Sequence, residues 1–362
     1  MIREQDVQEL VEFRSDGAQV LSVYLNLDPT RRNAEQYKLA LRSLLATVSD
    51  AAAPADVARV ERYVELEYNW QGRGLACFSC TAAGFWRVFS LPVSVPDLAY
   101  VGDRPYVKPL SDIMDTYARY GVILVDQEGA RLFVYNVGEL EEATGTLGVA
   151  VKHHKQGGWA AARYQRRAEG RAQQNLKSAA ELAARFYADG RCRRLLIGGQ
   201  EEAVARFQEY LPKALRERVV GTFSIEMSAS PAEVKERTLE LARRMEEQED
   251  AALVEQVITT AAKGGAATTG LADTLAMLQA ERVHLLVVAE GFHAPAYRCE
   301  RCRHIIVEPV ESCPICGGKM HFIADAVDSL VRRAIERGVE VNFVRDNQAL
   351  VRAGSIGALL RY

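Results

Sequence analysis

The chain has no apolar run near the roughly 18 to 20 residues that a membrane-spanning helix needs. Its first residues, MIREQDVQEL, are polar and do not contain the apolar core of a secretory signal. It also lacks an excess of either charge, because its formal net charge is only −3. An overall basic field is therefore excluded as the basis for nucleic-acid binding, and any such site must be a local patch. These absences predict a cytoplasmic protein.

Cysteine is scarce and unevenly placed, with seven residues in the chain and four of them close together. An odd number clustered in this way argues against a secreted disulfide framework. There is no P-loop motif for nucleotide binding, no internal repeat and no low-complexity tract. With 362 residues, of which 48% are hydrophobic and 26% charged, the chain is expected to form two or three cores.

Apolar runs that alternate with turn residues predict an α/β and α+β protein of three domains. Residues 1–117 are interpreted as a mixed-sheet N-terminal domain. Residues 118–248 are expected to form a central α/β domain that carries an exposed loop at 152–159. Residues 249–362 are expected to form a C-terminal α/β domain with a cysteine-rich insert at about 296–322.

Three further elements are predicted around the central domain. A third strand of its sheet is expected near Leu147 to Val151. A long helix from about Ala160 to Ala188 has apolar residues in steps of three and four, and Asp189-Gly190 ends it. A charge-rich helix from Ala232 to about Ala262 is long enough to connect two domains.

Two C-x2-C pairs are the strongest chemical signal in the sequence. Cys299 and Cys302 are separated from Cys313 and Cys316 by ten residues, a spacing that matches the tetrahedral four-thiolate site of zinc. Four free thiols are disfavoured, because the segment between the pairs has too few apolar residues to fold unaided. Since four cysteines close the coordination sphere, Zn²⁺ is predicted to be structural, with His304 and His321 as alternative ligands. The other cysteines are predicted to be core residues: Cys77, Cys80 and Cys192.

Positive charge is concentrated at residues 152–177, where seven lysines and arginines face the single acid Glu169. A solvated helix face is the simplest interpretation, but such faces normally mix both signs. Charge of one sign beside an exposed aromatic residue suits a phosphate backbone. The predicted RNA-binding residues are Lys152, His153, His154, Lys155, Gln156, Gly157, Gly158, Trp159, Arg163, Tyr164, Arg166, Arg167 and Arg171.

The loop KHHKQGGW and the helix start AAARYQRRAEGR resemble the peptidyl-transferase loop and following helix of archaeal and eukaryotic class-one release factors, a family related to Pelota. That family carries Gly-Gly-Gln. Gly157 and Gly158 match its glycines, whereas Trp159 replaces the glutamine that is associated with hydrolysis. Arg163 and Tyr164 match the family's Arg-aromatic pair.

The resemblance extends along nearly the whole chain, through YGVILVD at 120–126, the segment 270–291 and GSIGALLRY at 354–362. The cysteine insert falls where archaeal members have a zinc minidomain. The N-terminal strand VLSVYLNLDP is similar too, but the segment after it has no room for the family's Asn-Ile-Lys-Ser decoding loop. The resemblance therefore implies the fold without codon-specific stop reading.

A literal Gly-Gly-Gln occurs elsewhere, at Gly198, Gly199 and Gln200. It lies between a strand-like run and a helix-like run, which is the context of an ordinary strand-to-helix turn. A loop that reaches the ribosomal active site must be an exposed tip beside basic residues. The 152–159 loop has that context, and residues 198–200 do not.

The chain also looks like bacterial release-factor relatives such as the hibernation factor Balon. This resemblance implies a protein of the stress response that fills the ribosomal A site without peptide hydrolysis and has no catalytic residue. Trp159 is expected to stack on an unpaired base of large-subunit rRNA at the peptidyl-transferase centre. The N-terminal domain is expected near the small-subunit decoding centre. Elongation factor Tu or another translational GTPase is the implied delivery partner, with no membrane partner and a monomeric state off the ribosome.

Two alternatives stay open. In the first, the protein is a codon-independent rescue or release factor in which backbone amides of the loop orient a water for ester cleavage. The side chain of Trp159 argues against this, because it lacks an acceptor and leaves little room for the water. In the second, the chain is a protein-interaction module unrelated to ribosomes. For Trp159 itself, the alternative to stacking on RNA is a side chain that folds back onto its own domain.

Overall fold

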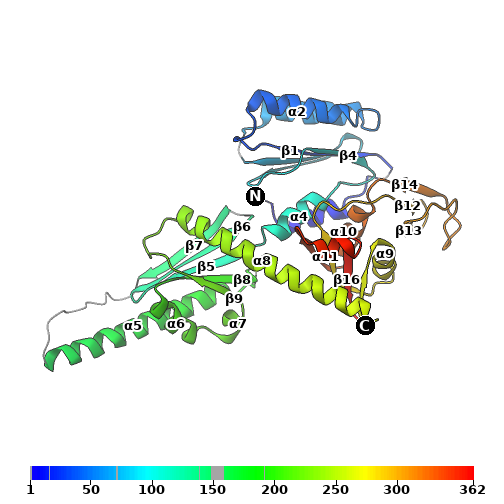
Figure 1. Cartoon of the computed structure of the whole chain (residues 1–362). Helices are drawn as coiled ribbons and strands as arrows, with labels where there is room; N and C mark the ends of the chain where they lie inside the picture. The colour runs from blue at the N-terminus through cyan, green and yellow to red at the C-terminus, as the bar shows by residue number, and fades with distance from the viewer. Residues whose placement is uncertain (1, 16, 71, 138, 148–158, 191) are drawn as a thin grey trace. The chain divides into compact units, whose positions relative to one another are not determined.

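The computed structural model describes residues 2–15, 17–70, 72–137, 139–147, 159–190 and 192–362, without the side chains of residues 146, 147, 159–165 and 167. The chain divides into two compact units, one made of Met1–Thr116 with Glu247–Tyr362 and the other of Tyr117–Glu246 (Figure 1). Division of the first unit into two domains stays a prediction. Every helix in the described ranges falls short of the length and apolarity required to cross a membrane.

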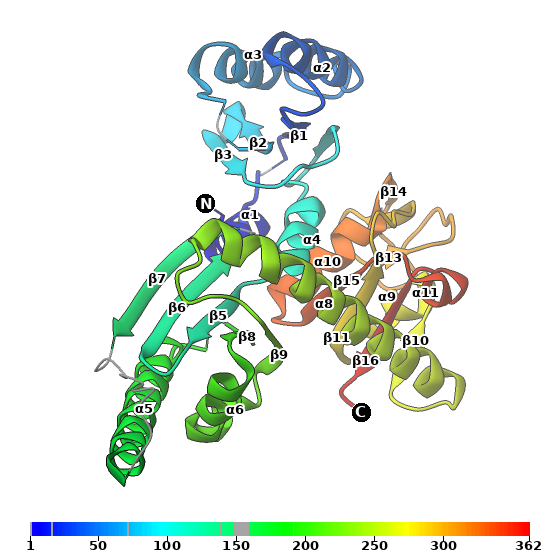
Figure 2. The same ribbon diagram turned by 60° about the vertical axis from the view of Figure 1, so that its left-hand side comes forward.

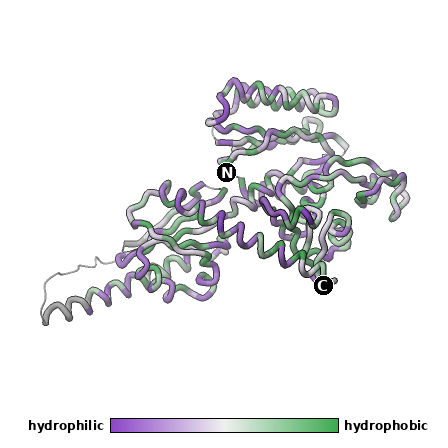
Figure 3. The backbone as a smooth tube through the Cα atoms, viewed as in Figure 1, coloured by the Kyte–Doolittle hydropathy of each residue, from purple (hydrophilic) through white to green (hydrophobic). Residues whose placement is uncertain are grey.

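The first part of the chain forms a four-stranded sheet in the order β3-β2-β1-β4. The strands are β1 (Val20–Asn26), β2 (Gly74–Cys80), β3 (Phe85–Leu91) and β4 (Leu98–Gly102). The helical segments are α1 (Glu4–Glu12), α2 (Ala34–Ala46), α3 (Pro54–Arg62), η1 (Tyr63–Glu67), η2 (Thr81–Ala83) and α4 (Lys108–Thr116). Hydrophilic and hydrophobic residues alternate along α2, as expected for a helix with one buried face (Figure 3).

This sheet is antiparallel throughout, so the expected mixed sheet is wrong. The reason is the helix α3, which the sequence analysis did not predict. One helix between β1 and β2 would return the chain to the start of β1 and make the two strands parallel. Two helices connect β1 to β2, so α2 takes the chain back toward the start of β1 and α3 returns it to the end of β1. The strand β2 therefore begins beside the end of β1 and runs in the opposite direction.

The central unit holds a five-stranded mixed sheet in the order β7-β6-β5-β8-β9. Its strands are β5 (Tyr120–Val125), β6 (Gly129–Asn136), β7 (Glu139–Leu147), β8 (Arg194–Gly199) and β9 (Val219–Phe223). Its helices are α5 (Trp159–Phe186), α6 (Glu201–Tyr210), α7 (Lys213–Arg216) and the first part of α8 (Pro231–Ala262). The third strand of this sheet is β7, in which Leu147 pairs with Gly129 at the start of β6. The strand expected near Leu147 to Val151 lies, beyond Leu147, outside the described residues.

Helices cover both faces of the central sheet (Figure 2). On one face, Leu176 of α5 and Phe207 of α6 pack in a core with Ile123, Leu132 and Ile197. On the other face, Val234 of α8 packs in a core with strand residues such as Val122. Because β7 runs parallel to β5, it ends beside the turn between β5 and β6.

The last part of the chain contains the sheet β10-β16-β11-β15 and a separate three-stranded sheet. The four strands are β10 (Ala267–Thr269), β11 (Val283–Ala289), β15 (Glu340–Val344) and β16 (Ile356–Leu360), and the helices are α9 (Leu271–Gln279), α10 (Ala326–Glu336) and α11 (Gln348–Arg352). The first residues of α8, up to Glu246, belong to the central unit, whereas those from Glu247 belong to the first unit. The sequence predicted a helix long enough to connect two domains, and α8 contributes residues to both units.

Candidate metal centre and basic helix

The cysteine-rich insert folds as a small ribbon of three short strands, β12 (Ala296–Cys299), β13 (Ile305–Ile306) and β14 (Met320–Ile323). They pair antiparallel in the order β13-β12-β14. The local core consists of only Cys299, Cys313 and Met320, with partly buried neighbours such as Tyr297. Ala296 and Ile305 of the ribbon strands pack instead in the larger neighbouring core. The cysteine end of the ribbon therefore has little apolar burial of its own and depends on a cross-link or a metal.

The two cysteine pairs have the same backbone geometry. The amide of Arg303 donates to the carbonyl of Cys299 at 3.1 Å, and the amide of Gly317 donates to the carbonyl of Cys313 at 2.8 Å. In both turns, the residue after the second cysteine is left-handed, with φ of 59° at Arg303 and 68° at Gly317. Such a conformation is costly for arginine and is retained where the surrounding structure requires it. The two turns therefore form matching knuckles.

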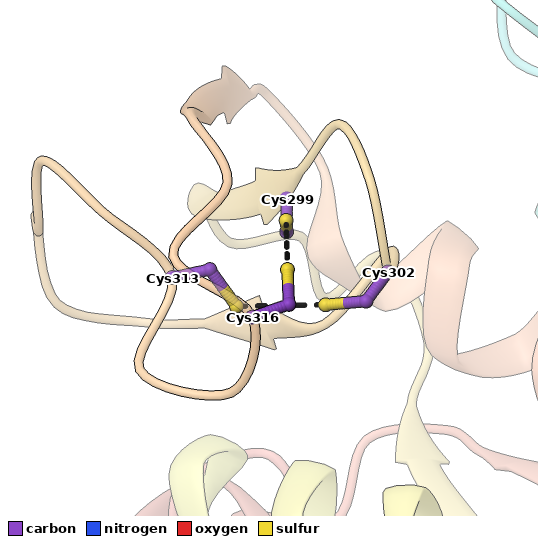
Figure 4. Close-up of side chains that lie close together, drawn as sticks. All are labelled: Cys299, Cys302, Cys313 and Cys316. Carbon is purple, nitrogen blue, oxygen red and sulfur yellow. Dashed lines mark hydrogen bonds between the residues drawn. The ribbon is translucent and has the colours of Figure 1, made fainter.

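The four sulfur atoms converge between the knuckles (Figure 4). All of them lie within 4.8 Å of one another. The Sγ atoms of Cys299 and Cys316 are 3.5 Å apart, as are those of Cys302 and Cys313. A tetrahedral zinc ion with four bonds near 2.3 Å separates its sulfur ligands by about 3.8 Å. The cluster thus fits Zn²⁺ in both donor chemistry and size.

The surroundings of the sulfurs also suit a metal. A Cβ atom on Gly318 would lie 2.9 Å from the Sγ of Cys299 and 3.4 Å from that of Cys316, so only glycine fits this position. The backbone N–H of Cys302 lowers the pKa of the Cys299 thiol to about 6, against desolvation of the thiol. A thiolate is the form that binds zinc.

The metal-type cluster found in the described part of the chain consists of cysteines alone, so His304 and His321 are not among the residues brought together. His321 instead contacts Glu300 through its Nε2 atom. The three cysteines that were predicted to be core residues are buried, as expected: Cys77, Cys80 and Cys192.

The predicted RNA-binding residues fall on the loop before α5 and on its first half. Lys152, His153, His154, Lys155, Gln156, Gly157 and Gly158 lie outside the described residues. Trp159 is the first residue of α5, and its side chain, like those of Arg163, Tyr164 and Arg167, lies outside the description. Arg166 and Arg171 are exposed.

The spacing along α5 arranges these positions. Positions 163, 167 and 171 are four residues apart, so their Cα atoms follow one side of the helix. The buried stripe begins at Ala172 and continues through Leu176, Ala179 and Ala183 on the opposite side. The basic positions of α5 therefore lie on one side of the helix, and the residues that pack in the core of the central sheet lie on the other.

The literal Gly-Gly-Gln lies at the turn from β8 to α6, as predicted. Gly199 has φ of 149°, and a Cβ atom there would meet the carbonyl oxygen of Val125 at 2.1 Å. Both properties require glycine for the backbone alone. These two glycines are therefore explained by strand packing.

Sequence reasoning missed a buried polar network around α10 in the first unit. The Asp328 Oδ1 atom accepts the amides of Val107 at 3.0 Å and Lys108 at 3.1 Å, and its Oδ2 atom lies 3.1 Å from Arg332. Lys108 is also paired with Asp325 at 3.2 Å. The available signal was the Asp328 to Arg332 spacing of four residues inside an otherwise apolar helix face.

Three other ion pairs continue this network toward the surface. Glu336 at the end of α10 lies 2.9 Å from Arg104 and 2.8 Å from Arg14. Arg298 of the ribbon lies 2.9 Å from Asp103. The segment 103–108 is thus fixed to α10 and to the start of the ribbon by side chains from both parts of the first unit.

In comparisons with known proteins, a family model and curated relatives both point to release factors. The family model described as "Bacterial archaeo-eukaryotic release factor family 10" matches residues 105–243. The peptide chain release factor subunit 1 of Thermococcus onnurineus is 22% identical over 402 residues, covering 98% of this chain and 96% of that protein. The corresponding protein of Archaeoglobus fulgidus is 22% identical over 393 residues, with the same coverage of 98% and 96%.

Among solved structures, an archaeal translation termination factor aligns with 100% of this chain and 99% of its own at 17% identity, with a TM-score of 0.29. The matched model covers the central unit, where the basic helix lies, and the relatives align along nearly the entire chain. These two findings relate the chain to the archaeo-eukaryotic release factors.

Proposed function

We propose that this protein binds the ribosomal A site without codon reading or peptide hydrolysis, as a ribosome hibernation or protection factor. The observation that carries the proposal is the replacement of the family's glutamine by Trp159 at the start of a helix whose outer half is basic. The family relationship supports ribosome binding, and the changed residue supports the loss of hydrolysis. No residue of the chain is assigned a catalytic role.

Binding is attributed to charge and stacking. Arg166 and Arg171 are exposed on α5, and positions 163 and 167 lie on the same side of the helix. Guanidinium groups at this spacing pair with successive phosphates of RNA. Gly157 and Gly158 carry no Cβ, which allows close approach of the backbone to RNA, and the indole of Trp159 offers a stacking face worth about 1 to 3 kcal/mol per base.

The ribbon is assigned a structural metal. Cys299, Cys302, Cys313 and Cys316 would hold Zn²⁺, and no position remains open for a substrate. The ion would supply cross-linking of the two knuckles. Delivery of the protein to the ribosome is assigned to elongation factor Tu or another translational GTPase, because the sequence has no nucleotide-binding motif of its own.

Ribosome pelleting tests the proposal. We expect the protein to co-sediment with idle ribosomes, and to lose affinity steeply with salt, since neutralised phosphates release counterions. A variant with Arg163→Glu, Arg166→Glu and Arg167→Glu should not pellet. The matched control is Arg206→Glu, Lys213→Glu and Arg216→Glu, which changes the net charge equally on exposed positions of α6 and α7. This control should still bind.

A peptide-release assay on ribosomes loaded with peptidyl-tRNA separates the proposal from a rescue or release factor. That alternative is favoured by the names of the relatives, which are release factors. We expect the rate of peptide release with the protein to equal the rate in buffer alone, whereas a hydrolase would raise that rate. Rapid release would assign the protein to the alternative, and absence of ribosome binding at low salt would point to a protein-interaction module.

A further inference from the structure

The helix α5 consists of a packed half and an outer half. Among the side chains of α5 that the structure describes, the buried ones begin at Ala172, which is 3% exposed, and continue to Ala183 in the last turn. Before this point, Arg166, Glu169, Gly170 and Arg171 are all exposed. Figures 1 and 2 show the outer half extending past the end of the central sheet. The outer half, defined here as residues 159–171, is the part that carries the basic positions.

The packed half is clamped to the sheet directly behind this boundary. Asn175 is 6% exposed, and its Nδ2 atom donates to the carbonyl oxygen of Gln127 at 3.0 Å. Gln127 lies in the turn between β5 and β6. That turn is held by Asp126, whose Oδ1 atom accepts the amides of Glu128 at 2.7 Å and Gly129 at 2.9 Å. A buried asparagine is unfavourable in a helix interior unless it is paired, so this contact is specific.

Gly170 lies just outside the clamp. A Cβ atom added there would meet no atom within 4 Å, and its φ is not in the left-handed region. Neither packing nor backbone conformation therefore requires glycine at this position. Alanine in such an interior position would raise the equilibrium constant for helix formation about four- to five-fold relative to glycine. A glycine kept at this cost, one turn before the clamp, weakens the helix where its two halves meet.

We propose that α5 is a jointed arm, in which Asn175 clamps the packed half to the β5–β6 turn and Gly170 lets the outer half bend. Asn175 is a positioning residue, because it sets the direction in which the outer half leaves the sheet. The use of the arm in reaching RNA rests on the proposed function, whereas the joint itself is a property of the free protein.

Distances between two spin labels test the arm in the free, metal-loaded protein. One label replaces Arg166 on the outer half and the other replaces Glu209, an exposed residue of α6 in the same unit. We expect a broad distance distribution that becomes narrower in Gly170→Ala. Amide exchange at residues 170–174 should slow about four- to five-fold in the same variant. Ser178→Ala is the control, because it raises helix propensity on the exposed side of the packed half and should leave both readouts unchanged.

The clamp predicts a different change. Asn175→Asp, which keeps the size but loses the donor, should shift the mean of the distance distribution, and Asn175→Leu serves if the aspartate variant fails to fold. Equal widths in the parent and Gly170→Ala proteins would overturn the joint, and an unchanged mean in the Asn175 variants would overturn the clamp. Ribosome pelleting is measured separately. If Gly170→Ala narrows the distance distribution but the parent protein does not bind ribosomes, only the proposed function is refuted.

Discussion

At the scale of single residues, glycine and cysteine determine the metal centre. Gly318 has no room for a Cβ because the Sγ atoms of Cys299 and Cys316 face it. Gly318→Ala should therefore lower zinc affinity by about ten-fold or more, as changes next to metal ligands typically do. Competition with a chromogenic chelator measures the affinity. Gly291→Ala tests for a general effect of glycine loss, because its surroundings are open, and an equal loss of affinity there would contradict the steric reason.

Asp112 predicts a pH dependence of stability. Burial, with the nearby Glu290, raises the pKa of the Asp112 carboxyl to about 6 from its ordinary value of 3.8. The folded state therefore binds this proton more tightly than the unfolded state, so stability falls as pH rises from about 4 to about 6. Asp112→Asn should abolish that part of the slope and gain about 2 kcal/mol over the parent protein at pH 7.5. Urea unfolding at pH 4.5 and 7.5 measures the free energy of unfolding of both proteins. If the difference between variant and parent were equal at both pH values, the raised pKa of Asp112 would be refuted.

What could be predicted at this scale depended on spacing. The two cysteine pairs are recognisable because their spacing directly reflects the geometry of a knuckle. The left-handed backbone at Arg303 could not be predicted, because arginine gives no local preference for it, whereas Gly317 at the equivalent position does. Asn175 was also missed, since its partner is a backbone carbonyl 48 positions away.

At the scale of helices and strands, α10 is joined to the segment 103–108 by buried charge. Asp328→Ala would leave two backbone amides without their acceptor and the Arg332 guanidinium without its carboxylate partner. Both side chains of this ion pair are less than 10% exposed. Breaking such a buried pair should cost about 3 to 5 kcal/mol. Denaturant unfolding followed by tryptophan fluorescence measures the loss.

The control for this variant is Asp273→Ala, which removes an exposed carboxylate from the first turn of α9. Its cost should stay below about 1 kcal/mol, since only the helix dipole is affected. If the two variants were equally stable, the Asp328 network would have no role in holding α10 to the rest of its unit.

Strands and helices with clear periodicity were predictable, and the exceptions have local causes. The helix α3 begins with Pro54 at its first position and has only nine residues, so it presents few apolar repeats. The strand β7, ELEEATGTL, alternates polar residues with small ones, and this edge strand shows no apolar run. Its position depends on pairing with β6, which local sequence does not reveal.

At the scale of the whole molecule, the ribbon should depend on its metal and the central unit should not. Removal of zinc with a strong chelator should raise amide exchange in residues 299–304 and 308–320 to the unfolded level, because the apolar cluster around the sulfurs consists of Cys299, Cys313 and Met320. Residues 117–246 should keep their protection. Elemental analysis should find one zinc ion per chain before chelation. A ribbon that stays protected without metal would contradict this prediction.

The family and the order of elements could be predicted from sequence, because motifs at 120–126, 152–159 and 270–291 appear in the same order as in the release factors. The joining of the first and last parts into one unit was not predictable. It depends on contacts such as those of Lys108 with Asp325, between residues 217 positions apart.

A unit made from both ends of the sequence affects how the protein is made. Met1–Thr116 emerges from the ribosome long before Glu247–Tyr362, whereas Tyr117–Glu246 is contiguous. The central unit can therefore complete its fold during synthesis, since domains form as their own residues emerge. The side chains of Tyr106 and Lys108 lack their partner Asp325 until more than 200 further residues have been made, so they stay open to solvent and to chaperones for that time.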